Sequence, residues 1–440
     1  MKSNNEANYP AERAVVAAND EQQLADIFKL NIDCFEEVFD YLVLADFAAM
    51  GQTCKRMQQI AGHCFLLNYG AEQVMFGVEG FNLLGVKIDC FNNVLQNVCI
   101  NHCLLSSYKD ESSVIPLKHS TSIKEIKMIF FDCGILSYDI YRIKDIISKA
   151  EKVSFSYGDK MLDDLLELCT NVKHLSFELG YQDEPQWTRR IYPKLEHIQF
   201  LPGTTKNVPA LNTFIELNTT IKQISITSQL LWINRTLFKN LNHKIDTLVI
   251  HYNDDKIEFD VFCRFLNELY EFGFYKKLHL IENFLIQEDI DQLASVKGLV
   301  KFKVQNYVHV GAFKDLEELC ANYSDDITDL ETLPHMLSKL NRVHFEDASS
   351  NDILPFIFHS NNLTKLKVED LSSGLHFDEN EKILNLFALN KEREKLVGAR
   401  KITIYVRQDV YILTKWAMKQ TDFNMIEMKR DSSYNWCCSF

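Results

Sequence analysis

A short run of cysteine and histidine residues carries the side chains in this chain that are best suited to binding a metal. Cys99, His102 and Cys103 form the motif CINHC, and Cys90 lies a little upstream. Structural zinc sites normally use two separated pairs of ligands. No second close pair with matching spacing accompanies CINHC, so the sequence favours buried thiols beside a strand. We therefore expect no metal and no other cofactor.

Motifs that carry catalytic chemistry are missing from the sequence. There is no glycine-rich nucleotide loop, no Walker lysine motif and no nucleophile elbow. The 13 histidines are scattered and show no pairing with carboxylates that would indicate a general base. We expect no catalytic residues and a polypeptide that is not an enzyme. An enzyme with a dispersed active site is the weakest alternative.

Polar and then basic residues recur at fixed positions of a repeated phrase: apolar, two variable, apolar, one variable, apolar. Side chains alternate along a strand, so the variable residues face away from the buried ones. The earlier copies place nearly neutral residues there: His174, Ser176, His197, Gln199, Gln223, Ser225 and Thr227. The later copies place basic residues there, which we assign to substrate binding: Lys277, His279, Lys301, Lys303, Arg342, His344, Lys365, Lys367 and Lys401.

Strands stacked about 4.8 Å apart would align these residues into a basic strip on an otherwise acidic molecule. One hypothesis is that the strip holds a protein substrate that is acidic or phosphorylated, through charge-assisted hydrogen bonds. The alternative is that exposed strands are often rich in lysine and that the strip has no function.

The repeated phrase itself predicts the architecture. Its copies are IKEIKM, AEKVSF, VKHLSF, LEHIQF, IKQISI, IDTLVI, YKKLHL, LVKFKV, LNRVHF, LTKLKV and ARKITI. One short strand every 20 to 30 residues is the signature of a leucine-rich-repeat solenoid. An ordinary α/β sheet is the alternative, but its strands would be continuously apolar. A wide gap between LVKFKV and LNRVHF suggests a degenerate copy near ITDLETL, Ile327–Leu333.

Helical patterns lie between several of these strands, at Leu162–Cys169, Phe259–Phe272 and Gln287–Val296. Strand, helix and strand at this spacing imply parallel strands on a concave face with helices outside, in a horseshoe. The expected fold class is therefore α/β.

A compact helical block over residues 30–62 precedes the repeats and does not follow their phrase. Asp33 with Glu36 suits a capping box for a first helix that reaches Leu42. A second helix is expected over 47–54 and a third over 55–61, with Gly62 as its left-handed C-terminal residue. Three such short helices bury little surface among themselves. The block should therefore either cap the solenoid or offer apolar surface to another protein.

The block resembles an F-box, the helical module that docks substrate receptors onto the Skp adaptor of cullin–RING ubiquitin ligases. The matching residues are Leu30-Asn31, Asp33, Cys34-Phe35, Val38-Phe39, Tyr41-Leu42, Asp46-Phe47, Thr53-Cys54-Lys55-Arg56, Met57 and Ile60-Ala61. Asn31 replaces the proline of the family pattern, and Met57 replaces an aromatic residue. The resemblance covers about a tenth of the chain, and an F-box followed by leucine-rich repeats is a recognised architecture.

The resemblance implies a substrate-recognition subunit of an SCF-type E3 ubiquitin ligase, with the Skp adaptor, cullin and RING subunits and a protein substrate as partners. The residues that it assigns to adaptor binding are Leu30, Cys34, Phe35, Val38, Phe39, Leu42, Phe47, Cys54 and Met57. The alternative is a leucine-rich-repeat scaffold that never enters a ligase, with the block as a cap.

The expected organisation has five parts: a disordered tail at 1–27, an F-box-like module at 28–69, a connecting region with a first degenerate repeat at 70–121, a solenoid of about eleven units at 122–407, and a C-terminal cap and tail at 408–440. The formal charge of −14 argues against non-specific binding to nucleic acid or anionic membrane. No stretch reads as a signal peptide or a membrane span, and the 12 cysteines suit reduced core thiols. We therefore expect a cytoplasmic or nuclear protein.

Overall fold

The computed structural model describes most of the chain. The described residues are 30–77, 79–101, 117–118, 120–129, 141–156, 162–177, 186–200, 211–252, 257–282, 287–304, 310–321, 331–371, 383–418 and 423–431. The expected disordered tail, His102 and Cys103, and most of ITDLETL lie outside these residues.

The described residues form one sheet of 17 strands. Strands β1 and β4 to β17 pair in parallel in chain order, with β4 beside β1, while β2 and β3 add an antiparallel hairpin to β1. The strands are β1 Gln73–Gly77, β2 Gly80–Leu83, β3 Val86–Lys87, β4 Asn97–Asn101, β5 Glu125–Ile129, β6 Lys152–Ser156, β7 His174–Phe177, β8 His197–Phe200, β9 Gln223–Thr227, β10 Thr247–His251, β11 Lys277–Ile281, β12 Leu299–Val304, β13 Glu318–Ala321, β14 Arg342–Ala348, β15 Lys365–Leu371, β16 Ile402–Val406 and β17 Ile426–Arg430.

The repeated phrase sets both the strands and their register. All eleven copies found in the sequence coincide with strands, and their apolar positions stack on one another, as Val153, Leu175 and Ile198 do. These three side chains are at most 1% exposed. Each repeat therefore buries its apolar face against its neighbours, as expected for a solenoid.

The described sheet contains more repeats than the eleven expected. Strands β1, β4, β13 and β17 also follow the phrase. Strands β1 and β4 lie in the region expected to hold a first degenerate repeat, whereas β13 and β17 are not among the eleven copies. The copy expected near ITDLETL falls mostly outside the described residues, but the same gap in the phrase contains β13, at Glu318–Ala321. This copy escaped notice because its last two positions are Cys320 and Ala321, which give a weak apolar signal.

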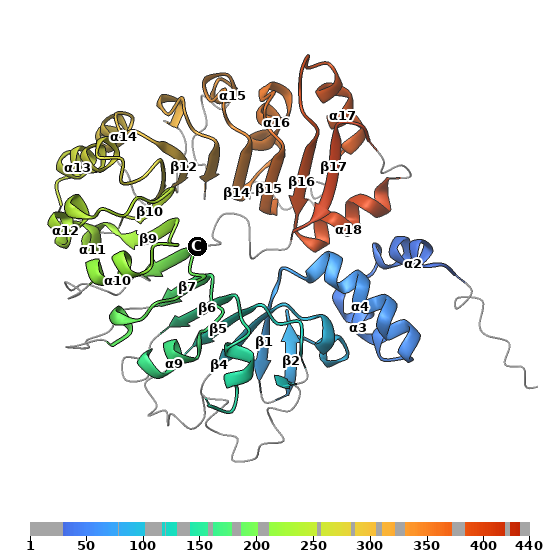
Figure 1. The fold of residues 1–440 in the computed structure, drawn as a ribbon. Coiled ribbons are helices and arrows are strands. Elements are labelled where there is room, and N and C mark those ends of the chain that lie inside the picture. The colour runs from blue at the N-terminus through green and yellow to red at the C-terminus, as the bar shows by residue number, and fades with distance from the viewer. Residues whose placement is uncertain are drawn as a thin grey trace, which may run out of the picture.

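Helices cover the outside of the strands, so that the strands line the inner face of a horseshoe (Figure 1). No helix among the described residues is long and apolar enough to cross a membrane. The outer helices are α8 Lys144–Ile147, α9 Leu162–Leu168, α10 Leu211–Leu217, α11 Ser228–Ile233, α12 Arg235–Asn240, α13 Phe259–Glu271, α14 Gln287–Leu293, α15 Leu333–Met336, α16 Ser350–His359, α17 Leu386–Glu394 and α18 Gln408–Ala417, with 3₁₀ turns η2 Asp89–Val94, η5 Gln186–Arg189 and η6 Val310–Ala312.

The N-terminal block is formed by α2 Ile32–Phe39, α3 Leu44–Gly51 and α4 Lys55–Tyr69. The expected Asp33 cap is wrong, because the N-cap is Asn31, whose Oδ1 accepts a hydrogen bond from the Cys34 backbone N–H at 2.9 Å. The expected helix end at Gly62 is also wrong. The helix continues because the next two turns add buried side chains, among them Phe65 and Tyr69.

Candidate functional site

The nine residues assigned to adaptor binding divide into two groups. Cys34, Val38 and Cys54 are exposed, and Leu30 and Leu42 are half-buried. The other four, Phe35, Phe39, Phe47 and Met57, are at most 1% exposed and belong to the core. A partner that binds the block in this conformation therefore contacts the first group, while the buried group holds the block together.

Aromatic packing explains why those four side chains point inward. The rings of Phe39 and Phe47 lie 4.8 Å apart, and Phe47 meets Tyr69 edge-on at 5.7 Å. Farther along α4, Phe65 stacks on Phe91 of η2 at 4.7 Å. The helical block is thus continuous with the core of the first repeats.

The outer surface of the block keeps apolar side chains in solvent. Ile32 and Val38 on α2 are 46% and 41% exposed, and Val43, just before α3, is 42% exposed. Ile32 and Val43 were not among the nine assigned residues. Ile32 is the first residue of α2, and the misplaced cap concealed this, whereas Val43 is the residue before α3.

The last strand is joined to the block by Arg430, which is 6% exposed. Its Nη1 donates hydrogen bonds to the Leu42 carbonyl at 3.0 Å and to the Tyr69 hydroxyl at 2.9 Å. Its Nη2 donates to the carbonyls of Phe39 at 3.2 Å and Asp40 at 2.6 Å. In Figure 1 the blue helices accordingly lie beside β17 and α18, between the two ends of the horseshoe.

Side chains of α18 reinforce this junction, which we name the clasp. The clasp consists of Asp40, Tyr41, Leu42, Tyr69, Gln408, Tyr411, Lys415, Trp416 and Arg430. The Asp40 carboxylate accepts a hydrogen bond from the Tyr411 hydroxyl at 3.2 Å and pairs with Lys415 at 3.3 Å. Tyr41 meets Trp416 edge-on at 5.8 Å. Burial, followed by the nearby Asp40 carboxylate, raises the pKa of Tyr411, so its phenol stays protonated and acts as a donor.

The basic strip of the concave face is present, but its charges are largely neutralised. Six of its seven lysines and arginines pair with carboxylates of the same face: Lys277 with Glu317, Lys301 and Arg342 with Glu318, Lys303 with Glu346, Lys367 with Glu369 and Asp431, and Lys401 with Glu427. The expected basic strip is thus part of a network of ion pairs. The sequence phrase did not reveal it, because several of the acids lie in β13, β17 or just beyond the strand core.

Part of this network lies in the interior. Lys367 and His344 are 1% and 2% exposed, and both lie 3.0 Å from Oε1 of Glu369. Burial tends to raise the pKa of Glu369, but the neighbouring His344 and Lys367 outweigh it and hold this pKa at about 2. His344 Nδ1 also lies 3.3 Å from Sγ of Cys320.

Cys320, His344 and Glu369 thus have the order of a thiol, an imidazole and a carboxylate that activates cysteine nucleophiles in enzymes. Cys320 is only 1% exposed, however, and neither it nor His344 lines the hollow described below. Reactive cysteines are normally partly exposed. We therefore interpret the group as a buried polar network that fixes the register of β13 to β15.

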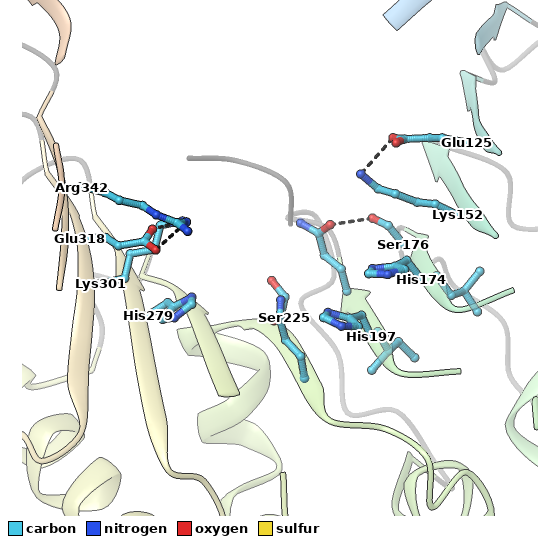
Figure 2. Close-up of a pocket in the computed structure, with 14 residues that line it drawn as sticks. Glu125, Lys152, His174, Ser176, His197, Ser225, His279, Lys301, Glu318 and Arg342 are labelled. Carbon is cyan, nitrogen blue, oxygen red and sulfur yellow. Dashed lines mark hydrogen bonds and ion pairs between the residues drawn. The ribbon is translucent and has the colours of Figure 1, made fainter. Parts of the chain in front are cut away.

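A hollow of about 450 Å³ lies on the concave face, between repeats that curve toward each other. Figure 2 shows His174, Ser176 and His197 on one wall, with His279, Lys301, Glu318 and Arg342 on the other and Ser225 between them. Glu125 and Lys152 form an ion pair of 3.0 Å at the rim of the first wall. The neutral residues seen in the early repeats and the first part of the basic strip therefore face one another across one space.

The histidines of the hollow are neutral at ordinary pH. The rings of His174 and His197 stack at 4.1 Å. Burial, then the neighbouring His197, lowers the pKa of His174 to about 4, and burial with Lys301 lowers that of His279 to about 3. Imidazole in this state offers one donor and one acceptor.

These shifts predict a loss of stability in mild acid. In the unfolded chain His174 and His279 bind protons near pH 6.5, whereas in the folded chain they do not until about pH 4 or below. The free energy of unfolding therefore falls as pH drops from 6.5 toward 4. A His174→Gln and His279→Gln double variant should lose part of this dependence, measured as urea midpoints at several pH values. The exposed His335→Gln should keep it, and an unchanged slope in the double variant would contradict the prediction.

The cysteine motif lies at the edge of the described residues. Cys99 is buried in β4, and burial raises the pKa of its thiol. Cys90 is half-buried near Ala48, and burial raises its pKa to about 11. Both thiols are therefore protonated at neutral pH. The described residues contain no group of three or more potential metal ligands, but His102 and Cys103 are not among them, so the absence of a metal stays a prediction.

No family model matches the chain, and no curated protein matches its sequence. Solved structures with a similar path include the leucine-rich repeat-containing protein LegL7 from Legionella pneumophila, at 11% identity over 73% of this chain and 98% of LegL7, with a TM-score of 0.38. Rad7, solved in the yeast Rad7–Elc1 complex, has 11% identity over 84% of this chain and 96% of its own, with a TM-score of 0.36. TLR13, solved with ssRNA13, has 13% identity over 72% of this chain and 46% of its own, with a TM-score of 0.31.

Because these TM-scores lie below 0.5, no partner or activity is transferred from those proteins. The architecture is established instead by the chain's own parallel strands and their repeated register. The described residues form an α/β solenoid of the leucine-rich-repeat type, preceded by three helices.

Proposed function

We propose that the chain is the substrate-recognition subunit of an SCF-type E3 ubiquitin ligase. Its helical block binds the Skp adaptor, and through it the cullin and RING subunits, while the concave face binds a protein substrate. The chain has no active site of its own and acts in the cytoplasm or nucleus. It contributes proximity, because holding a substrate lysine near the conjugating enzyme raises its effective concentration.

The exposed apolar surface of the block carries this proposal. Ile32, Val38 and Val43 are each more than 40% exposed, whereas the opposite side of the block is engaged in the core and the clasp. Exposed apolar side chains on so small a helical module favour a protein-binding role for it. Because residues 30–61 resemble an F-box, the partner that we propose for this surface is the Skp adaptor.

A specific observation supports the alternative, a leucine-rich-repeat scaffold that is not assembled into a ligase. The block packs on the first repeats through Phe65 and Phe91 and on the last strand through Arg430. It therefore has a structural role without any partner. For the same reason, deletion of the block would disturb both ends of the solenoid, and point variants on its outer surface give the cleaner test.

Co-expression with the Skp adaptor should give a stable complex that an Ile32→Asp and Val38→Asp double variant weakens by about 100-fold or more, because two central apolar contacts are replaced by charge. The affinity is measured by biolayer interferometry at low and high salt. A matched control replaces two exposed apolar residues far from α2, Leu84→Asp and Val397→Asp, which are 76% and 91% exposed. Failure of the wild-type chain to bind the adaptor would favour the scaffold.

A further inference from the structure

We propose that the hollow binds an extended polypeptide segment that carries a single carboxylate or phosphate among uncharged polar side chains. This inference deepens the proposed function, since it names the class of substrate that the concave face would select. It also narrows the initial hypothesis of a strongly acidic substrate.

The charge of the hollow sets the number of anionic groups. Its lining contains three cations, Lys152, Lys301 and Arg342, and two carboxylates, Glu125 and Glu318. The histidines in it are uncharged near neutral pH, because burial lowers the pKa of His174, His197 and His279. The lining therefore carries one excess positive charge, which favours the binding of a single anionic group.

That excess charge is located on a single wall. Glu318 is shared by two cations, lying 3.4 Å from Lys301 Nζ and 3.0 Å from Arg342 Nη1. Lys365 lies beside the hollow and outside its lining, where it follows Arg342 in register on the next strand. No carboxylate of the described residues lies within ion-pair distance of Lys365. Burial and then the neighbouring Arg342 lower the pKa of Lys365, and this outweighs the opposing effect of Glu318. An anionic oxygen of a bound ligand, placed beside Arg342 and Lys365, would neutralise the remaining positive charge of this wall.

The opposite wall is suited to neutral polar groups. His174 and His197 stack on each other, and Ser176 Oγ donates a hydrogen bond to Gln199 Oε1 at 2.9 Å. Together with Gln223 and Ser225, these side chains offer both donors and acceptors without charge. Backbone and side-chain amides of a bound segment are the groups that such a wall complements.

A densely acidic segment fits this arrangement less well. Additional carboxylates would meet Glu125 and Glu318, which lie on opposite walls (Figure 2). The remaining lysines of the strip, such as Lys303 at 2.6 Å from Glu346, already have their anions. The walls face each other across about 450 Å³, a volume within the range of binding pockets.

The test is a selection of displayed random 12-residue peptides on the full chain. The enriched peptides should share one acidic residue flanked by Asn, Gln, Ser or Thr. A synthetic enriched peptide, its amide analogue (Asp→Asn or Glu→Gln) and its phosphoserine analogue are then compared by fluorescence anisotropy. The anionic peptide should bind at least about tenfold more tightly than the amide analogue, because a charge-assisted hydrogen bond is lost in the amide. The phosphoserine arm distinguishes a carboxylate from a phosphate.

The Arg342→Gln and Lys365→Gln double variant should abolish the preference for the anionic peptide over the amide analogue, while both still bind. A control with the same loss of charge, Lys277→Gln and Lys401→Gln, replaces exposed cations of the same sheet that are not in register with Arg342, and it should keep the preference. Thermal unfolding checks that each variant is folded. The proposal is overturned if the selection enriches no peptides, if they lack a common acidic residue, or if the double variant weakens both peptides equally.

The test of peptide binding by the hollow can be separated from the test of adaptor binding by the helical block. The Ile32→Asp and Val38→Asp variant leaves the hollow intact and should bind the selected peptide as the wild type does. Peptide binding without adaptor binding would overturn the ligase proposal alone. Adaptor binding without a preference for the anionic peptide would overturn the inference about the hollow alone.

Discussion

Replacing Arg430 with methionine is expected to lower the free energy of unfolding by about 3–5 kcal/mol, since several buried acceptors lose their donor at once. The guanidinium donates to the carbonyls of Phe39, Asp40 and Leu42 and to the Tyr69 hydroxyl. It also lies over the ring of Tyr411, 5.0 Å from its centroid. No methionine side chain can replace these contacts, although it fills a similar space.

The loss of stability in the Arg430→Met variant should affect the clasp before it affects the rest of the solenoid. Hydrogen exchange is expected to accelerate in α2 to α4 and in α18 and β17, while the amides of the central strands stay protected, because contacts in a solenoid pass only between neighbours. The control is Arg407→Met at the start of α18, whose side chain is 47% exposed and pairs with Asp370 and Asp409. Surface pairs of this kind contribute about 1 kcal/mol or less. Equal effects of the two substitutions would contradict the role assigned to the clasp.

Substitution of a second buried arginine, Arg393, should lower the free energy of unfolding by a similar amount. Arg393 is fully buried in α17, and its guanidinium donates to five carbonyls, those of Ile357, Ser360, Asn361, Leu363 and Arg400. Burial lowers its pKa to about 10, so it stays charged at neutral pH. Arg393→Met is expected to cost about 3–5 kcal/mol, because it leaves the end of α16 and the turn before β16 without their donor.

Chemical unfolding followed by circular dichroism measures this cost. Lys395→Met in the same helix is the matched control, because its ammonium pairs with Glu392 at an exposed site. The control should change stability by about 0.5 kcal/mol or less. A small effect of Arg393→Met would mean that water or another side chain takes over the five carbonyls.

The strands were predictable from the sequence because each repeat buries its own apolar residues against the next one. Val172, Leu175 and Phe177 form one copy of the phrase, and all three are at most 1% exposed. The helices at Phe259–Glu271 and Leu162–Leu168 were predictable for a similar reason, since their apolar period is local. Errors arose where the phrase was weak, as in β13, or where a cap was misread, as at Asn31.

The candidate sites were predicted less well than the fold. The sequence placed basic residues on the concave face, and the strands bring His279, Lys301 and Arg342 into one row, with Glu318 between the last two. It did not show that most of these cations are neutralised by acids from other strands. It also could not distinguish the buried Phe35 from the exposed Val38, because both belong to one apolar pattern on α2.

The sequence by itself determined the solenoid, because the energy of a repeat depends mainly on neighbours within a few tens of residues. Only the tertiary structure decided how the two ends meet. Arg430 and Leu42 are 388 residues apart in the chain, and no local pattern relates them. The same holds for the hollow, where the curvature of the sheet brings His174 opposite Arg342. Curvature accumulates over many repeats, so surfaces that face each other across the horseshoe are a property of the whole array.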